Sequence, residues 1–246
     1  MPNRITQAVI LSAGLGTRLR EVTGDAVPKV MVPLLGRPIL EWHIERLKKH
    51  GVQEFFINLF YLPNKIKEYF GDGSKLGVKI NYVLEEPEIR GTAGGIKDFE
   101  GKLRDNFFVI YGDVYNEIDY AKMEEEFAKH SDLITLTTVG ENDHPWDSDL
   151  VELDSDSRFL KIHPKPHQEL PVKYKAMRAA VFIFNQRILK YIPAQTYYEI
   201  DHKLLPEVMA RGELVYGYEP SKSEFIKDIG TPERYHAVEK RLAKFT

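Results

Sequence analysis

The sequence contains no cysteine among its 246 residues. Disulfides, thiolate zinc sites and cysteine nucleophiles are therefore excluded, and a reducing compartment is compatible with this composition. No segment approaches the roughly 20 apolar residues that a membrane-spanning helix needs. The first residues, MPNRITQAVILSAG, contain too short an apolar run for a signal peptide. We therefore expect a soluble cytoplasmic protein.

The chain also lacks a large excess of charge of either sign. Its formal net charge is −3, and its isoelectric point is near 6.3. Such a balance creates no long-range field that would attract nucleic acid or an anionic membrane, so we expect neither as a partner. An anionic ligand must instead be held by a few placed cations and backbone amides. Hydrophobic residues make up 43% of the chain, which is enough to build a sizeable core.

Apolar runs and helical patterns alternate through the first half of the chain. The runs predict strands at residues 5–12, 54–59, 78–84 and 106–111. The helical patterns between them predict helices at residues 38–50, 62–70 and 91–99. This order argues for right-handed βαβ units. We predict an α/β protein with a three-layer α/β/α, Rossmann-like fold and a mixed, mostly parallel sheet.

The second half is less regular. Residues 132–139 alternate apolar residues with threonine, as a half-covered strand would, and residues 149–153 and 158–162 flank a turn as in a hairpin. Further strands are expected at 176–184 and 214–218, and further helices at 120–129, 186–192, 201–211 and 232–244. Because no linker, low-complexity tract or internal repeat is found, we predict one domain over 1–246. Residues 1–115 form its nucleotide-type half.

A glycine turn follows the first buried strand. Gly14 and Gly16 stand in GLGTR, after the strand that ends near Leu11 and Ala13, and Thr17 closes the turn. Ligands bind at such strand ends in open α/β sheets, and glycines let main-chain amides approach a phosphate. The motif is neither a dinucleotide fingerprint nor a P-loop, because it lacks a third glycine and the sequence GxxxxGK[ST]. A phosphate loop and an ordinary turn both remain open.

Two cations in the same loop favour anion binding. Arg18 has a planar fork for two-point phosphate contacts, and Lys29 carries a compact charge suited to a developing oxyanion. Both lie at the carboxyl end of the first strand. The alternative is that they are two solvated surface cations.

The combination of motifs resembles a known family. AVILSAGLGTRL, VPKVMVPLLGRPIL and LKKHGV are followed by EEPEIRGTAGGI, VIYGDV, Lys165-Pro166 and KDIGTPERY. In this order they are similar to the sugar-1-phosphate nucleotidylyltransferases, and most of all to mannose- and heptose-1-phosphate guanylyltransferases. The resemblance covers nearly the whole chain. It implies transfer of a nucleotidyl group from a nucleoside triphosphate to a sugar 1-phosphate, with release of pyrophosphate, and a sugar-phosphate-binding half at about residues 116–246.

The resemblance also implies a Mg²⁺ site. Asp113 ends the strand predicted near residues 106–111, and Asp228 follows a short strand expected at Phe225-Ile226. In similar family members these two aspartates are the metal ligands. Two carboxylates from strand ends suit Mg²⁺, which binds few protein oxygens. The alternatives are a turn aspartate for Asp113 and a cap near Gly230 for Asp228.

Further roles follow from the same motifs. Arg18 is implied to contact the triphosphate, Lys29 the α-phosphate and Lys165 the sugar phosphate. Pro164 stands where the family usually has a sugar-binding glutamate, and Val114 stands where many glucose-type members have asparagine. Nucleotide binding is assigned to Leu11, Ala13, Gly14, Gly16, Thr17, Glu86, Gly91, Thr92 and Gly112.

The nucleotide and the sugar are less specified than the reaction. A carboxylate at Glu85 or Glu86 could accept hydrogen bonds from guanine N1 and N2, although an acidic surface turn is an equal interpretation. The segment HPWDSDL from His144 resembles the heptose-1-phosphate branch, which favours GTP. A uridylyltransferase for an amino-sugar or muramic-type 1-phosphate is the alternative enzyme. A non-catalytic nucleotide-sugar sensor is the alternative of another class, and any homodimer would have to form through the α/β body.

Overall fold

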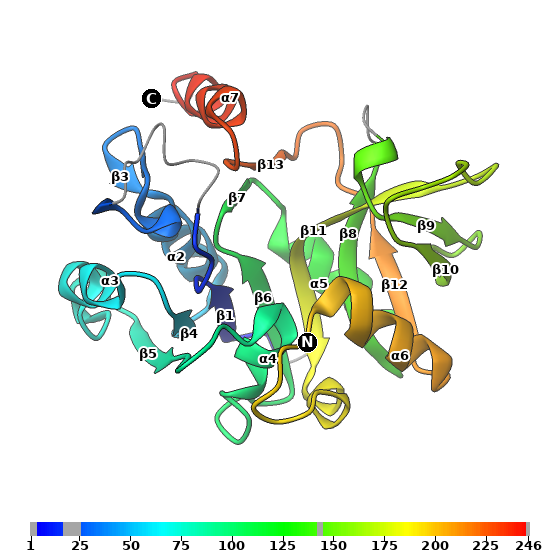
Figure 1. Cartoon of the computed structure of the whole chain (residues 1–246), viewed down its shortest axis with the longest axis horizontal. Helices are drawn as coiled ribbons and strands as arrows, with labels where there is room; N and C mark the ends of the chain where they lie inside the picture. The colour runs from blue at the N-terminus through cyan, green and yellow to red at the C-terminus, as the bar shows by residue number, and fades with distance from the viewer. Residues whose placement is uncertain (1–3, 17–25, 142–144, 245–246) are drawn as a thin grey trace.

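The computed structural model describes residues 4–16, 26–141 and 145–244 (Figure 1). Its main sheet has nine strands, in the order β10-β9-β11-β6-β1-β4-β5, with β8 pairing with β11 and β12. The strands of the first half are β1 (Gln7–Leu11), β4 (Glu54–Leu59), β5 (Lys79–Leu84) and β6 (Asn106–Tyr111). The strands of the second half are β8 (Leu133–Gly140), β9 (Leu150–Leu153), β10 (Phe159–His163), β11 (Lys175–Asn185) and β12 (Leu214–Tyr218). The predicted mixed α/β sheet is confirmed.

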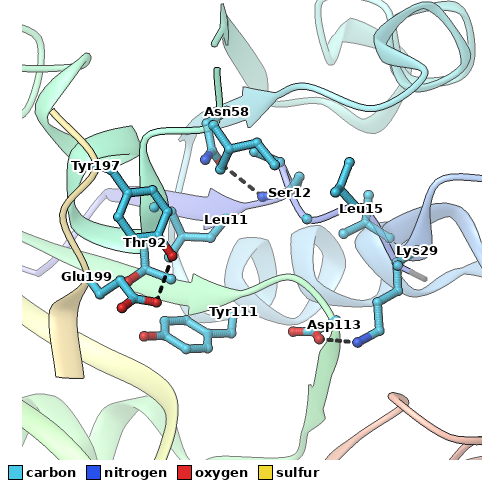
Figure 2. Close-up of a pocket in the computed structure, with 16 residues that line it drawn as sticks. Leu11, Ser12, Leu15, Lys29, Asn58, Thr92, Tyr111, Asp113, Tyr197 and Glu199 are labelled. Atoms are coloured by element: carbon cyan, nitrogen blue, oxygen red, sulfur yellow. Dashed lines mark hydrogen bonds and ion pairs between the residues drawn. The ribbon is translucent and has the colours of Figure 1, made fainter. Parts of the chain in front are cut away.

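The four strands of the first half run parallel. β1 pairs with both β4 and β6, and β4 pairs with β5, all in parallel register. β11 then joins the opposite side of β6 in antiparallel register. The carboxyl ends of β1, β4 and β6 therefore meet at one edge of the sheet, which Figure 2 shows in close-up. Ligand sites of open α/β sheets lie at this edge.

Helices cover both faces of the sheet. The helices are α2 (Ile39–His50), α3 (Pro63–Phe70), α4 (Gly91–Lys97), α5 (Tyr120–Ala128), α6 (Leu205–Ala210) and α7 (Pro232–Leu242). Side chains of α2, α3, α5 and α7 belong to one buried apolar cluster, while those of α4 and α6 belong to a second. Successive residues of β1 alternate between them, with Ala8 and Ile10 in the first cluster and Val9 in the second. The three-layer prediction is thereby confirmed.

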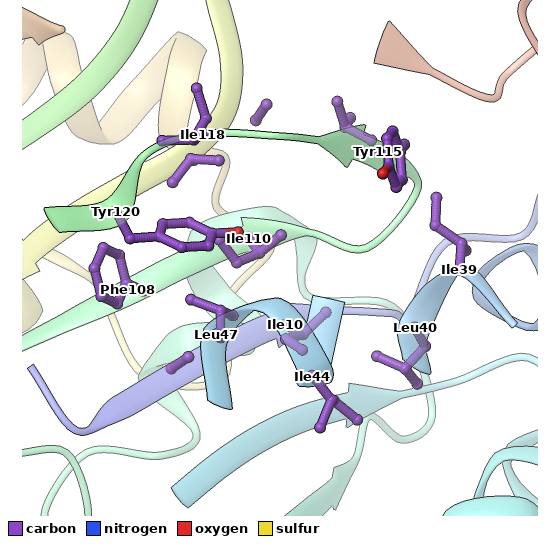
Figure 3. Close-up of a cluster of buried hydrophobic side chains, with 14 of the residues drawn as sticks. Ile10, Ile39, Leu40, Ile44, Leu47, Phe108, Ile110, Tyr115, Ile118 and Tyr120 are labelled. Carbon is purple, nitrogen blue, oxygen red and sulfur yellow. The ribbon is translucent and has the colours of Figure 1, made fainter. Parts of the chain in front are cut away.

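The first cluster lies beneath α2 (Figure 3). Leu40, Ile44 and Leu47 recur at helical spacing along α2 and are fully buried against the sheet. The ring of Phe108, from β6, lies 5.7 Å from His50 and 5.2 Å from Tyr120 between ring centres. This packing fixes α2, α5 and β6 against one another.

The prediction for the strand near residues 132–139 was wrong in one respect. All eight residues of β8 are buried, including Thr135, Thr137 and Thr138, instead of one covered and one solvated face. β11 and β12 flank β8 on both edges. Leu136 joins the first apolar cluster and Ile134 the second, so both faces of the strand are covered.

Short elements complete the chain. β2 (Pro33–Leu34) pairs with β3 (Arg37–Pro38), and β7 (Val114–Asn116) pairs with β13 (Ile226–Asp228). The helix expected near residues 186–192 is a 3₁₀ helix, Gln186–Tyr191, and the one expected at 201–211 begins with a π turn, Ile200–Leu204. Within the described ranges, no helix combines the length and apolar character needed to cross a bilayer.

We predict that Phe108→Ala lowers the free energy of unfolding by about 3–5 kcal/mol, because it removes a fully buried ring and leaves a cavity. Urea denaturation measures this loss. Val172→Ala is the control, since Val172 is fully exposed and should change stability by no more than about 0.5 kcal/mol. A loss below about 1 kcal/mol for Phe108→Ala would contradict the packing described here.

Candidate active site

A cavity of about 400 Å³ opens at the carboxyl ends of β1, β4 and β6 (Figure 2). The glycine loop after β1 forms one wall, and the start of α4 and the end of β6 form others. Its described lining residues are Leu11, Ser12, Ala13, Gly14, Leu15, Gly16, Lys29, Val30, Asn58, Ile89, Gly91, Thr92, Tyr111, Asp113, Tyr197 and Glu199. The motifs from distant parts of the sequence therefore share one cavity.

A buried chain of hydrogen bonds forms its floor. The Ser12 amide donates to Asn58 Oδ1 at 2.8 Å, and Asn58 Nδ2 donates to Glu85 Oε1 at 2.7 Å. The other carboxylate oxygen of Glu85 accepts from the Arg90 amide at 2.6 Å. Burial raises the pKa of Glu85, and these donors oppose the shift. A Cβ at Gly95 would lie 2.5 Å from Glu85 Oε1. Only glycine at this position therefore lets α4 pack against these hydrogen-bonded side chains.

An ion pair joins two walls of the cavity. Lys29 Nζ pairs with Asp113 Oδ2, and the lysine side chain is only 11% exposed. Lys29 begins a 3₁₀ turn after the loop, while Asp113 lies in the turn between β6 and β7. Gly16 has a φ of +64°, and a Cβ there would lie 3.1 Å from Lys29 Cβ, so glycine is required where the loop meets the lysine. The pair sets a cation and an anion side by side at the cavity wall.

The turn that carries Asp113 is itself anchored. The Gly112 amide donates to Leu11 O at 3.0 Å, and a Cβ on Gly112 would lie 2.6 Å from that oxygen. His43 Nε2 lies 3.2 Å from Gly112 O. Burial lowers the pKa of His43 to about 4, so the neutral ring donates its Nε2–H to the carbonyl. Gly112 thus supports the site from behind the cavity wall.

The main chain of the second predicted metal ligand lies near that of the first in space, although the two residues are far apart in sequence. Asp228 is opposite Val114 in the β7–β13 pair, and the Ile229 amide donates to Asp113 O at 3.0 Å. Both oxygens of Asp228 lie 2.9 Å from Arg234 Nη1. Asp228 is absent from the described lining of the cavity.

The residues fit Mg²⁺ in their donor chemistry. No group of three or more His, Cys, Asp or Glu side chains that could hold a metal occurs among the described residues. Mg²⁺ does not need such a group, because it commonly takes one or two carboxylates together with substrate phosphates and water. Asp113 and Asp228 supply carboxylates at neighbouring strand ends, and each now has a cation, Lys29 or Arg234, beside it.

The remaining wall comes from the segment before α6. Tyr197 OH donates to Glu199 Oε1 at 3.0 Å, and both residues line the cavity. Thr92 Oγ1 accepts from the Ile200 amide at 2.8 Å, which ties this segment to α4. Neither residue was among the site residues predicted from the sequence. The aromatic pair followed by a carboxylate was the available signal.

Tyr111 reaches a buried carboxylate behind this wall. Tyr111 OH donates to Asp201 Oδ2 at 3.0 Å, while Asp201 Oδ1 is buried without a hydrogen-bond partner. Burial is the main cause that raises the pKa of Asp201 to about 6, and the nearby charge of Asp149 adds to it. Neither Tyr111 nor Asn58 was singled out from the sequence, because both end or interrupt apolar runs that predicted only strands.

The structure brings together most of the predicted site residues. Leu11, Ala13, Gly14, Gly16, Lys29, Gly91, Thr92 and Asp113 all line the cavity. Glu86 is exposed and lines an adjoining hollow of about 280 Å³ that shares Ile89 and Tyr197 with the cavity. Thr17 and Arg18 lie outside the described residues, as does His144.

Lys165 stands apart from the cavity. Its Nζ donates to Asp147 O at 3.0 Å, and its amide donates to Asp149 Oδ1 at 3.0 Å. Asp149 in turn accepts from His202 Nε2 at 2.9 Å. These bonds hold Lys165, which follows β10, against the loop before β9. Its predicted contact with the sugar phosphate stays a prediction.

The fold and the cavity define a nucleotide-diphospho-sugar transferase type of protein. Among solved structures, HddC from Yersinia pseudotuberculosis complexed with GMP-PN superposes with a TM-score of 0.77 at 27% identity, covering 97% of this chain and all of the other. A family model described as nucleotidyl transferase matches residues 7–244. The chain belongs to this family, so the resemblance inferred from the motifs is confirmed.

Two curated relatives are sugar-1-phosphate guanylyltransferases by name. D-glycero-alpha-D-manno-heptose 1-phosphate guanylyltransferase of Campylobacter jejuni is 41% identical over 233 residues, which are 94% of this chain and 97% of that protein. Mannose-1-phosphate guanylyltransferase of Mycobacterium tuberculosis is 32% identical over 237 residues, which are 96% of this chain. The chain spans only 64% of the length of the latter relative.

We predict that the buried Asp201 makes the protein less stable as pH rises. Because its pKa is raised to about 6 in the folded state, the native protein holds one more proton than the unfolded chain between about pH 4 and pH 6. Stability relative to Asp201→Asn should therefore fall across this window by about 3 kcal/mol. Urea denaturation of both proteins at several pH values measures the difference. Parallel stability curves for the two proteins would contradict a buried, proton-holding Asp201.

Proposed function

We propose that this protein transfers a nucleotidyl group from GTP to a sugar 1-phosphate and releases pyrophosphate, with Mg²⁺ as its cofactor. The observation that carries the proposal is the Lys29–Asp113 ion pair beside the glycine loop. It supplies a cation for phosphate oxygens and a carboxylate for a metal ion within one cavity. The names of the two guanylyltransferase relatives support the same reaction.

In this reaction a phosphate oxygen of the sugar 1-phosphate attacks the α-phosphorus of the nucleotide in line. The bond from the α-phosphorus to the bridging oxygen breaks, and pyrophosphate leaves with that electron pair. Positioning and charge neutralisation carry most of the rate, so little covalent help from the protein is needed.

Each of three basic residues is assigned to a different phosphate group of the substrates. Lys29 binds the α-phosphate and exchanges its bond with Asp113 for one with the substrate. Arg18 binds the departing pyrophosphate. Lys165 holds the sugar phosphate, for which its Nζ must give up Asp147 O. For Lys165 the exchange replaces a neutral carbonyl by a charged phosphate oxygen, which makes the stronger hydrogen bond.

Asp113 and Asp228 are the residues that would hold Mg²⁺. When bound, the ion neutralises charge on the phosphate oxygens and orients them for displacement. The exchange of Lys29 from Asp113 to the phosphate leaves that carboxylate available as a ligand. Arg234 keeps Asp228 oriented from the first turn of α7.

The choice of GTP is supported by Glu86 at the rim of the cavity. Its exposed carboxylate lies in the adjoining hollow, where it can accept from guanine N1 and N2, whereas the carboxylate of Glu85 is committed to Asn58 and Arg90. UTP offers only one such donor, at N3. Thermal shifts with the four triphosphates compare the bases directly, and the largest shift is expected with GTP.

The reaction is tested by incubating the purified chain with Mg²⁺, GTP and a panel of sugar 1-phosphates. We expect pyrophosphate release, its loss in EDTA, and a fall of about 10²–10³-fold in kcat/KM for Lys29→Ala, because a charge that stabilises the transition state is removed. Lys79→Ala is the matched control, since Lys79 also pairs with a carboxylate but is exposed at the first residue of β5 and is not part of the described cavity lining.

The outcomes separate the classes of function. Silence with every triphosphate and every sugar rejects the enzyme. Tight binding of a nucleotide sugar without turnover would instead favour a sensor that regulates another enzyme. Equal losses for Lys29→Ala and Lys79→Ala would remove Lys29 from the site.

A further inference from the structure

Among the described residues, only two carboxylates line the cavity, Asp113 and Glu199. In Figure 2 they approach it from different sides, with Asp113 beside Lys29 and Glu199 beside Tyr197 and Thr92. Asp113 is engaged by Lys29. Glu199 therefore presents the one cavity-lining carboxylate, within the described residues, for which the proposed phosphate chemistry has no use.

Glu199 is held in a defined orientation. Its Oε1 accepts from Tyr197 OH at 3.0 Å, and its Oε2 lies 3.7 Å from His202 Nδ1. The backbone around it is fixed to α4, because the Ala93 amide donates to Tyr198 O at 2.9 Å and Thr92 Oγ1 accepts from the Ile200 amide. A side chain positioned in this way is suited to recognition, since little rotamer freedom is lost when a ligand binds.

The origin of the wall indicates which substrate it meets. Of the described cavity-lining residues, Tyr197 and Glu199 alone come from the second half of the chain. The glycine loop, Lys29 and the start of α4 come from the first half, where the nucleotide is assigned. Tyr197 also lines the hollow assigned to the base, whereas Glu199 does not, so the second substrate, the sugar, is the one that lies against Glu199.

We propose that Glu199 selects the sugar, by accepting hydrogen bonds from its hydroxyl groups and by repelling sugars that carry a carboxylate. This inference rests on the proposed function. A carboxylate offers only acceptors, so it pairs with hydroxyl donors and never with another anion. Two further acidic side chains, Asp201 behind Tyr111 and Asp149 beyond His202, make this end of the cavity more negative.

The proposal separates neutral sugars from acidic ones, and the acidic ones include the muramic type that the sequence left open. A neutral, hydroxyl-rich hexose or heptose 1-phosphate satisfies Glu199. A muramic-type or uronic acid 1-phosphate would bring a second carboxylate to the same wall. Lys29 is the one cation among the described lining residues, so no other described lining residue could neutralise this charge.

The test compares wild type with Glu199→Gln, which keeps the size of the side chain and an acceptor for Tyr197. The substrates are a neutral hexose 1-phosphate from the panel and the matching uronic acid 1-phosphate, with GTP and Mg²⁺. We expect the KM for the neutral sugar to rise about 10–100-fold, because charged hydrogen bonds to hydroxyls are lost. The KM for GTP should stay the same, and the preference for the neutral over the acidic sugar should fall several-fold.

Glu207→Gln is the matched control. Glu207 accepts from Tyr198 OH on the same segment but is not part of the cavity lining, so this variant should keep the wild-type KM for both sugars. Equal effects of the two variants would show a general loss of structure and reject the assignment.

The remaining outcomes distinguish failure of the Glu199 assignment from failure of the proposed function. A rise in the KM for GTP with an unchanged KM for the sugar would assign Glu199 to the base and overturn the proposal, while the transferase function would stand. An unchanged sugar preference would overturn it in the same way. Absence of turnover by wild type with every triphosphate and sugar rejects the proposed function, and the assignment of Glu199 with it.

Discussion

The site depends on one constraint, which is that the parallel strands of the first half all end at the same edge of the sheet. A buried chain of hydrogen bonds through Asn58 secures this edge. The side-chain amide of Asn58 accepts from the Ser12 backbone N–H and donates to Glu85. The segments that follow β1 and β5 are thereby both tied to the end of β4. Without these bonds the glycine loop would have no fixed relation to the start of α4, and the cavity between them would lose its floor.

β6 and the small β7–β13 pair supply the acidic residues at this edge. β6 delivers Tyr111 and Asp113, and the small β7–β13 pair brings Asp228 next to Asp113 along the backbone. Lys29 pairs directly with Asp113 at the cavity wall. Lys29 and Asp113 thus neutralise each other in the free protein. In the proposed reaction, Lys29 would bind phosphate and Asp113 would bind the metal ion. Of the described residues that line the cavity, Tyr197 and Glu199 come from the second half of the chain.

Much of this architecture could be predicted from the sequence, because long buried strands and glycine turns leave strong local signals. β4 and β6 have the bounds that their apolar runs predicted. The signal was weaker where tertiary contacts decide. The threonines of β8 suggested a solvated face that β11, β12 and the two apolar clusters in fact cover. Asn58 looked like part of an apolar run, and its role needs Ser12 and Glu85, which are distant in sequence.

The most direct test of the central claim is a crystal structure of the chain with Mg²⁺ and the guanosine diphosphate sugar formed from the best substrate. The account predicts phosphate oxygens on Lys29 Nζ, Mg²⁺ held by Asp113 and Asp228, and sugar hydroxyls on Glu199. A nucleotide sugar bound outside the cavity, or phosphates that leave the Lys29–Asp113 pair intact, would contradict it.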